Sequence, residues 1–359
     1  MTNQQIKELL MSKKELVSLK NEDYLSTGST LLNLACSGRS DGGFIKGNYY
    51  FLVGDSASGK TFLSLTCLAE ASINKNFDCY RFIYDNSEGG ALMDIQKFFG
   101  TRVMERLEPP KTDENGLPSY SSTIEEFYFN VDDAIERGEP FIYILDSMDS
   151  LSSVDEISKF EETKEAFEKG KEAAGSYGDG KAKKNSANLR RLLTPLRKSG
   201  SILMIINQTR DNLGFGFEKK TRSGGHALRF YACLEMWSSI KEKISKNIKG
   251  AARQLGILCK VQIKKNRLTG RERSVTIPIY HSYGIDDIGS CVDYLVEEKH
   301  WEQKAGTINA PEFEFKGTRD KLIKHIEENQ MEKDLKMIVG DFWNEIEEAC
   351  KVKRKTRYE

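Results

Sequence analysis

The sequence lacks an excess of charge of either sign. Its 359 residues carry 54 Lys and Arg against 54 Asp and Glu, so the formal net charge at pH 7 is zero. A protein that held nucleic acid through global basicity would carry a surplus of cations. Any nucleic-acid surface must therefore come from local clusters of Lys and Arg.

Long apolar runs and paired cysteine motifs are also missing. No stretch approaches the ~18 apolar residues that span a bilayer, and residues 1–20 contain no run of the kind found in signal peptides. The seven cysteines are scattered, odd in number and form no C-x-x-C pair, which is typical of reduced thiols. We therefore expect a soluble protein with no membrane partner, located in the bacterial cytoplasm or, for a viral protein, in that of the host cell.

What the sequence does contain is an alternation between short apolar runs and helical stretches. The runs that predict buried strands lie at 49–53, 80–84, 141–145 and 202–206, and further strand-like segments at 255–261 and 274–280 extend the same sheet. Such alternation predicts an α/β fold with a doubly wound, mostly parallel sheet and helices on both faces.

The pattern changes towards both ends of the chain. Residues 1–25 carry apolar side chains at helical spacing among many charges, which predicts a short N-terminal helical arm that contacts another protomer. Residues 26–303 form the expected core. Within 304–359, two amphipathic stretches predict a small C-terminal helical domain.

The most specific motif follows the first apolar run. The segment 54–61 matches G-x-x-x-x-G-K-[ST] and lies between a strand-like run and a helical stretch, which is the context that the motif requires. In such a loop the backbone N–H groups and the helix N-terminus bind phosphate, the lysine holds the β- and γ-phosphates, and the hydroxyl binds Mg²⁺. A glycine-rich turn without this function is the competing interpretation. The residues expected to bind ATP are Gly54, Ser56, Ala57, Ser58, Gly59, Lys60 and Thr61.

Acidic residues after two later strands complete the expected ATP site. Asp146 follows the third apolar run, and we expect it to bind ATP and, with Thr61, to hold Mg²⁺ at the carboxyl edge of the sheet. Hydrolysis also requires a carboxylate that positions or deprotonates water. Glu88, beyond the second run, is the first candidate, and Asp85 is the second. Both acids could instead cap a helix that starts near Ala91.

Two further runs, 205–210 and 223–232, complete a pattern that resembles the RecA family of recombinases, including its phage members of the UvsX type, over roughly residues 26–301. The resemblance implies a RecA-type P-loop ATPase core and a DNA-dependent ATPase. It also implies a homo-oligomer in the form of a helical filament on single-stranded DNA, which promotes homologous pairing and strand exchange with duplex DNA. By the same resemblance Glu88 is catalytic and Gln208 senses the γ-phosphate.

The segment 261–267 resembles the family's segment that crosses the protomer interface. The resemblance implies that Lys265 and Arg267 act on the neighbour's ATP, where they would stabilise charge on the transferred phosphoryl group. Solvated cations on an edge strand are the competing interpretation. By the same resemblance, the position of the aromatic residue that would stack on adenine falls near Ile95, so the resemblance does not identify the residue that contacts adenine.

Two segments are expected to hold DNA, near 152–186 and 210–225. The second interleaves cations with Phe215 and Phe217, and this combination of phosphate-binding and base-stacking side chains is usual for single strands. An exposed loop and a solvated charged helix are the competing interpretations. The expected DNA-binding residues are Arg210, Lys219, Lys220, Arg222, Gly224, Gly225, Arg229, Lys183, Lys184 and Arg190.

Two other classes of protein share parts of this pattern. A replicative helicase motor has the same fold, and its ATP site is likewise completed by residues of the neighbouring subunit. We expect such a motor to carry a larger N-terminal domain than residues 1–25 provide. A non-catalytic recombination mediator or paralogue would be favoured by loss of Glu88 or of the basic loops, and the sequence has both. The sequence therefore favours the recombinase.

Overall fold

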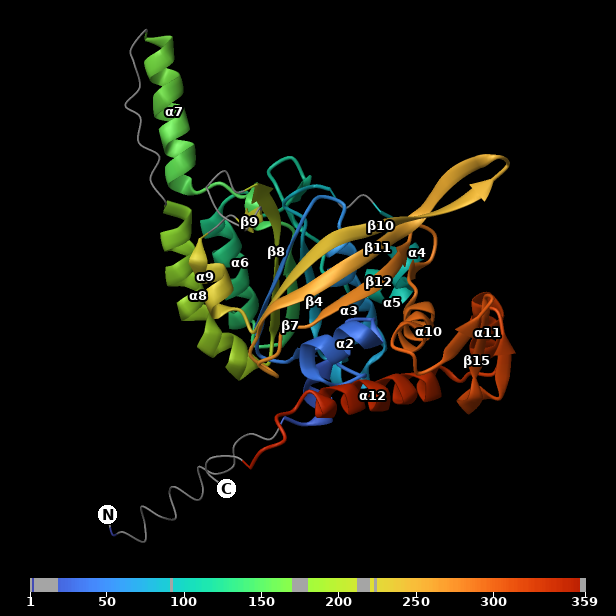
Figure 1. Cartoon of the computed structure of the whole chain (residues 1–359). Coiled ribbons are helices and arrows are strands. Elements are labelled where there is room, and N and C mark those ends of the chain that lie inside the picture. Colours follow the sequence, from blue (N-terminus) through green and yellow to red (C-terminus); the bar gives the residue numbers. More distant parts are fainter. Residues whose placement is uncertain are drawn as a thin grey trace.

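The computed structural model describes residues 2, 19–90, 93–169, 180–211, 220–222 and 225–355, with only the backbone at 211 and 222. Its central sheet has the order β13-β12-β11-β10-β3-β8-β7-β4, and β9 pairs with β8 (Figure 1). The strands are β3 (Tyr49–Gly54), β4 (Arg81–Asp85), β7 (Phe141–Leu145), β8 (Ile202–Asp211), β9 (Lys220–Arg222), β10 (Leu234–Ile248), β11 (Ala251–Asn266), β12 (Ser274–Tyr280) and β13 (Gly284–Ile285).

The expected mostly parallel sheet is confirmed. Strands β4, β7, β8, β3 and β10 pair in parallel, and β11, β12 and β13 add antiparallel strands at one edge. Each of the six predicted apolar runs overlaps one of these strands. The carboxyl ends of the parallel strands therefore meet along a single edge of the sheet.

Side chains alternate between two apolar layers, one on each face of the sheet. Tyr50 and Leu52 belong to one layer, whereas Tyr49, Phe51 and Val53 belong to the other. The first layer is covered by α2 (Thr30–Ser37), α3 (Lys60–Ile73), α5 (Thr101–Arg106), α10 (Asp287–Glu297) and α12 (Glu332–Ala349). The second is covered by α6 (Ile124–Glu136), α8 (Gly180–Ser199) and α9 (His226–Tyr231). The doubly wound arrangement is confirmed, because buried strands need cover on both faces.

Inserts between these elements form smaller structures. Within 108–122 lies a hairpin of β5 (Lys111–Thr112) and β6 (Pro118–Ser119), and α4 (Ile95–Phe99) precedes α5. The charged insert begins with α7 (Val154–Glu168), which projects away from the sheet (Figure 1). None of the helices in the described part of the chain is long and apolar enough to cross a bilayer.

The two ends of the described chain differ from the expected helical segments. The arm's residues 3–18 lie outside the described residues, and Tyr24–Leu25 forms β1, which pairs with β2 (Phe44–Ile45). The two predicted C-terminal helices are present as α11 (Arg319–Glu328) and α12. They follow a three-stranded antiparallel sheet that the sequence did not indicate. Its strands are β14 (Glu302–Lys304), β15 (Thr307–Ala310) and β16 (Phe315–Gly317).

Helix α12 is attached to the turn between β11 and β12 through one carboxylate. Glu347 is 8% exposed, accepts hydrogen bonds from Arg273 at 2.5 and 2.8 Å, and also pairs with Arg271. Hydrogen bonding from Arg273 is the main cause that lowers the pKa of Glu347 below its ordinary value. The ionised carboxylate is therefore favoured in the folded state.

We expect the substitution Glu347→Gln to lower the free energy of unfolding by about 2 kcal/mol at pH 7, because hydrogen bonds to charged groups are lost. A depressed pKa stabilises the fold above the pKa of the unfolded chain. The difference from wild type should therefore hold above about pH 5 and shrink as the pH falls through the folded-state pKa.

Urea unfolding at several pH values measures this difference. The control is Glu348→Gln, because among the described residues Glu348 pairs only with the exposed Lys351 and should contribute little. A difference between wild type and Glu347→Gln that does not change with pH would contradict the assignment.

Candidate nucleotide site

The phosphate-loop motif joins β3 to α3 at the carboxyl edge of the parallel strands. A Cβ at Gly54 would lie 2.2 Å from Ser238 Oγ, and a Cβ at Gly59 would lie 2.8 Å from Ile279 Cδ1. Gly59 also has φ +90°, a conformation that side-chain-bearing residues rarely adopt. The loop therefore passes close to β10 and β12, and its backbone leads directly into the N-terminus of α3, where N–H groups lack helical acceptors.

Lys60 lies folded back over this loop. Its Nζ donates to the carbonyl oxygens of Gly54 at 3.0 Å and Asp55 at 2.7 Å. The residue is 8% exposed, and burial lowers the pKa of the ammonium group below its ordinary value. A phosphate group in the loop would give this buried cation charged oxygens in place of carbonyl groups, which is a stronger kind of hydrogen bond.

Thr61, in the first turn of α3, and Asp146, which follows β7, lie side by side. Thr61 Oγ1 donates to Asp146 Oδ2 at 2.6 Å, and the hydroxyl of Tyr84 donates to the same oxygen at 3.1 Å. A hydroxyl and a carboxylate are oxygen ligands of the type that Mg²⁺ takes from proteins, with phosphates and water as the remaining ligands. The pair fits a phosphate-bound Mg²⁺, whereas no cluster of three His, Cys, Asp or Glu ligands occurs among the described residues.

Sequence reasoning missed Tyr84. Alternation along β4 places Tyr84 in the apolar layer that contains α3, and its neighbour Asp85 faces the other layer. The only signal in the sequence is a tyrosine at the end of the run 80–84.

Glu88 and Gln208 meet beside this pair. Gln208 Nε2 donates to Glu88 Oε1 at 2.9 Å, and Glu88 is fixed through its N–H, which donates to the carbonyl oxygen of Asp146 at 2.8 Å. The backbone N–H of Gln208 donates to Asp149, which was not expected as a site residue. Both side chains line one cavity together with Ser147, Asp149, Ser150, Thr209 and Arg210.

Asp85, the alternative base, lies on the wrong face of the sheet. It is 5% exposed and accepts hydrogen bonds from Ser121 N at 3.0 Å, Ser121 Oγ at 2.5 Å and the Tyr143 hydroxyl at 2.6 Å. These bonds hold it under α6. The capping interpretation is also wrong for the described residues, because α4 begins at Ile95 and Asp94 caps it.

Lys265 and Arg267 lie at the opposite edge of the sheet from the phosphate loop. In the register of the sheet, Lys265 on β11 lies opposite Glu235 on β10, and Glu235 lies opposite Phe51 on β3. Gly54 lies three residues beyond Phe51, which is roughly 10 Å further along β3. Nζ of Lys265 donates to the carbonyl oxygens of Arg229 at 2.7 Å and Phe230 at 2.6 Å.

Arg267 shares one of these acceptors. Its Nη2 donates to the carbonyl oxygen of Phe230 at 2.6 Å, so both cations lie at the C-terminal end of α9. Burial, and then the neighbouring Arg267, lower the pKa of Lys265 to about 8. The two residues therefore form one cationic cluster that does not reach the phosphate loop of its own chain.

The residue that precedes the segment 210–225 and one described residue within it attach to the phosphate loop. Thr209 Oγ1 donates to Asp55 Oδ1, and Lys220 Nζ is paired with Asp55 Oδ2. Arg210 is largely exposed, with Nη2 3.6 Å from Asp149 Oδ1. Lys219, Gly224 and the side chain of Arg222 lie outside the described residues.

The remaining cations expected to hold DNA fall into two groups. Lys184 is paired with Glu125 and, at 2.7 Å, with Asp155, and Arg229 Nε lies 3.0 Å from the buried Glu235. Lys183 and Arg190 are exposed on α8. Gly225 packs closely on the same helix, because a Cβ there would lie 2.6 Å from Ala182 Cβ.

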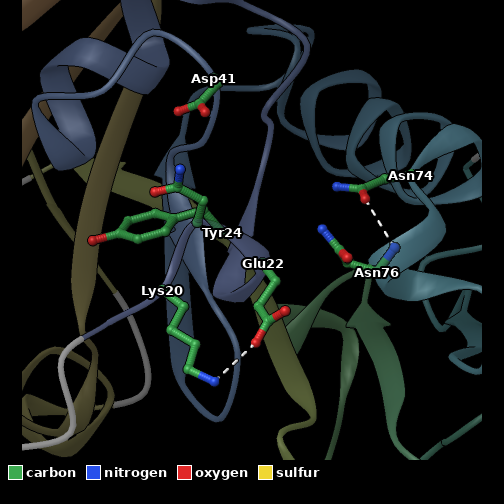
Figure 2. A pocket seen from close by; sticks show the side chains of 7 residues that line it. Lys20, Glu22, Tyr24, Asp41, Asn74 and Asn76 are labelled. Atoms are coloured by element: carbon green, nitrogen blue, oxygen red, sulfur yellow. Dashed lines mark hydrogen bonds and ion pairs between the residues drawn. The ribbon is translucent and has the colours of Figure 1, made fainter.

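A second hollow lies away from these residues. Figure 2 shows that Lys20, Glu22, Tyr24, Asp41, Asn74 and Asn76 line it. Asn74 follows the C-terminus of α3, so this hollow is separated from the phosphate loop by the length of the helix, about 20 Å. Lys20 pairs with Glu22 at 3.3 Å within it. It is therefore not part of the nucleotide site.

Comparisons with known proteins agree with this geometry. The RecA N-terminal domain model matches residues 133–286. Protein RecA of Cytophaga hutchinsonii is 29% identical over 304 residues, 82% of this chain and 73% of that protein. Protein RecA of Chlorobaculum tepidum is 28% identical over 281 residues, 76% of this chain and 70% of that protein. DNA repair protein recA homolog 3, mitochondrial, of Arabidopsis thaliana is 28% identical over 327 residues, which are 88% of this chain and 67% of that protein. By its sheet, its phosphate loop and these relatives, the chain is similar to proteins of the RecA family over most of its length.

Proposed function

We propose that the protein is an ATP-dependent homologous-recombination protein that forms filaments on single-stranded DNA and promotes pairing and strand exchange with duplex DNA. The observation that carries this proposal is the meeting of Glu88 and Gln208 beside Lys60, Thr61 and Asp146, at the edge where the basic segment after Gln208 begins. Under this proposal, the residues assigned to ATP hydrolysis lie next to the start of the segment assigned to DNA binding.

The proposed role of each side chain follows from its contacts. The backbone of the loop and Lys60 bind the phosphates of ATP, and Thr61 and Asp146 hold Mg²⁺, which neutralises phosphate charge when bound. Glu88 orients or deprotonates the attacking water. A γ-phosphate competes with Glu88 for the amide of Gln208, so ATP binding would release Glu88 and move the end of β8.

Asp55 supports a link between nucleotide and DNA. It accepts a hydrogen bond from Thr209 on β8 and pairs with Lys220 on β9, so the phosphate loop is joined to the residue before the segment 210–225 and to a residue within it. A phosphate near Asp55 would repel its carboxylate, and a DNA phosphate would compete for Lys220. Either ligand therefore changes the environment of the other, as coupling requires.

The placement of Lys265 and Arg267 supports a role across a subunit interface. Because these cations lie at the edge opposite their own phosphate loop, a head-to-tail contact would bring one protomer's cations to the next protomer's ATP. Such a heterologous contact produces an open helical filament when the rotation does not close. Hydrolysis would then require assembly.

The substitution Glu88→Gln should leave ATP binding intact and lower turnover by roughly 100-fold or more, because general-base catalysis is lost. Lys60→Ala should abolish ATP binding, because the phosphates lose their buried cation. Hydrolysis on saturating single-stranded DNA and binding of a fluorescent ATP analogue measure the two effects. Glu105→Gln, at an exposed position on α5, is the matched control. Normal hydrolysis by the Glu88 variant would show that the base is assigned wrongly.

A mixture of two inactive variants tests action across the interface. Arg267→Ala should bind ATP but not hydrolyse it, because the neighbour's ATP lacks its cation. A Glu88→Gln protomer can still provide its Arg267 to an Arg267→Ala neighbour with an intact Glu88. Mixing the two should therefore restore partial ATPase activity on single-stranded DNA.

The control for the mixture is Glu88→Gln combined with Lys60→Ala. Both of these changes affect the half of the site that binds ATP in its own chain, so no junction between them has two intact halves. If co-assembled Arg267→Ala and Glu88→Gln protomers gain no more activity than this control, Arg267 does not act across the interface.

Single-strand binding should depend on Arg210. Arg210→Ala removes one cation, so the slope of log affinity against log salt should decrease by about 0.7, the value for one phosphate contact on a single strand. Fluorescence anisotropy with a labelled oligonucleotide over a salt titration measures the slope. Lys198→Ala, at an exposed position of α8, is the control. An unchanged slope would remove Arg210 from the DNA surface.

A further inference from the structure

The end of β4 and the turn after it hold Asp146 at three points. The backbone N–H of Asp146 donates to the carbonyl oxygen of Asp85 at 2.9 Å, and its carbonyl oxygen accepts from the N–H of Glu88 at 2.8 Å. The third contact comes from a side chain, since the hydroxyl of Tyr84 donates to Asp146 Oδ2 at 3.1 Å. One short segment therefore fixes the backbone of Asp146 and also contacts its carboxylate.

Tyr84 reaches this carboxylate from inside the apolar layer that α3 covers. The residue is 9% exposed, and its register partner on β7 is Ile144, two residues before Asp146. Asp146 is the only hydrogen-bond partner of the Tyr84 hydroxyl within the described part of the chain. A buried hydroxyl requires a partner, and a phenol keeps its hydrogen at neutral pH. Tyr84 is therefore a constant donor to Asp146.

The carboxylate of Asp146 is held through one of its two oxygens. Asp146 is 3% exposed, and both of its hydroxyl donors, Thr61 at 2.6 Å and Tyr84 at 3.1 Å, bind Oδ2. Rotation of a carboxylate about its last bond is otherwise broad. Two donors on Oδ2 restrict this rotation, so the direction of the other oxygen, Oδ1, is also fixed.

The two donors differ in what else they do. The hydroxyl of Thr61 is itself assigned to Mg²⁺, whereas the hydroxyl of Tyr84 contacts only the carboxylate. Carboxylates that bind metal ions are commonly held by such hydrogen bonds, which orient them toward the metal. Tyr84 is thus the donor that can hold Asp146 without leaving it when a metal ion binds.

We propose that Tyr84 is a positioning residue for Mg²⁺, whose hydroxyl holds the carboxylate of Asp146 in the orientation that receives the metal ion with a nucleotide. Tyr84 acts through Asp146 and sets the affinity for Mg²⁺. It leaves the chemical step unchanged, because other contacts hold Lys60 and Glu88. The proposal rests on the proposed function only in that the site binds Mg²⁺ together with a nucleotide.

The test compares two tyrosine variants of the full chain. Tyr84→Phe removes one oxygen atom and keeps the ring that packs in the apolar layer. The matched control is Tyr80→Phe, because Tyr80 is also buried in this layer and its hydroxyl donates to the carbonyl oxygen of Gly200 at 2.9 Å. Tyr80 precedes β4 and so lies at the opposite end of this strand from Asp146.

Three measurements separate metal binding from nucleotide binding and turnover. Binding of a fluorescent ADP analogue is measured in EDTA and over a titration of Mg²⁺. Binding of Mn²⁺ in the presence of ADP is measured by electron paramagnetic resonance. ATPase activity on single-stranded DNA is measured over the same range of Mg²⁺ concentrations.

For Tyr84→Phe, we expect the Mg²⁺ concentration for half-maximal nucleotide binding and the Kd for Mn²⁺ each to rise about tenfold, as when other groups that orient metal ligands are removed. Nucleotide affinity in EDTA and kcat at saturating Mg²⁺ should stay at the wild-type values. Tyr80→Phe should match wild type in every measurement. A tyrosine that served only to fill the layer would not change the dependence on metal, because phenylalanine fills the same space.

Three outcomes would overturn the proposal. The first is a wild-type metal dependence in Tyr84→Phe, and the second is an equal shift in Tyr80→Phe. The third is a loss of nucleotide affinity in EDTA that matches the loss with Mg²⁺, because the hydroxyl would then support the fold of the loop. A wild-type protein without DNA-stimulated ATPase, whose Tyr84→Phe variant still shows the metal shift, would refute the proposed function and support the role of Tyr84.

Discussion

The structure of the site depends on the parallel order of β3, β8, β7 and β4. Because parallel strands end along one edge, residues from distant parts of the sequence are brought together there without any loop having to fold back. The hydrogen bond between Thr61 and Asp146 joins the first turn of α3, which follows β3 and the phosphate loop, to the end of β7, although β8 lies between these two strands. Gln208 extends from β8 and therefore lies between the phosphate loop and Glu88. A change in strand order would separate all of these groups.

Much of this arrangement could be predicted from the sequence. Apolar runs bounded by helical stretches define the parallel strands, and the phosphate-loop motif fixes which strand end carries the nucleotide site. The choice between Asp85 and Glu88 could not be made in this way. It depends on which face of β4 each acid reaches, and the hydroxyls of Ser121 and Tyr143 that hold Asp85 come from distant segments.

Partners of charged side chains were the least predictable feature. Lys184 and Arg229 resemble DNA-binding cations in sequence, yet each is paired with a carboxylate from another element. Ion pairs depend on tertiary distances, which the local sequence does not determine. The strands within 302–317 could not be predicted for a related reason, because they are very short and have no long apolar run.

The contacts of Asp55 bear on how ATP binding and DNA binding could affect each other. Its carboxylate is bonded to Thr209 and Lys220 while its own backbone carbonyl accepts from Lys60. Asp55 is thus part of the phosphate loop and also contacts the sheet edge and the basic segment. Coupling between ATP binding and DNA binding would then require neither a rotation of domains nor a chain of intervening residues. This coupling would consist of a local exchange of hydrogen-bond acceptors around one side chain. It would occur on the timescale of side-chain rotamer changes.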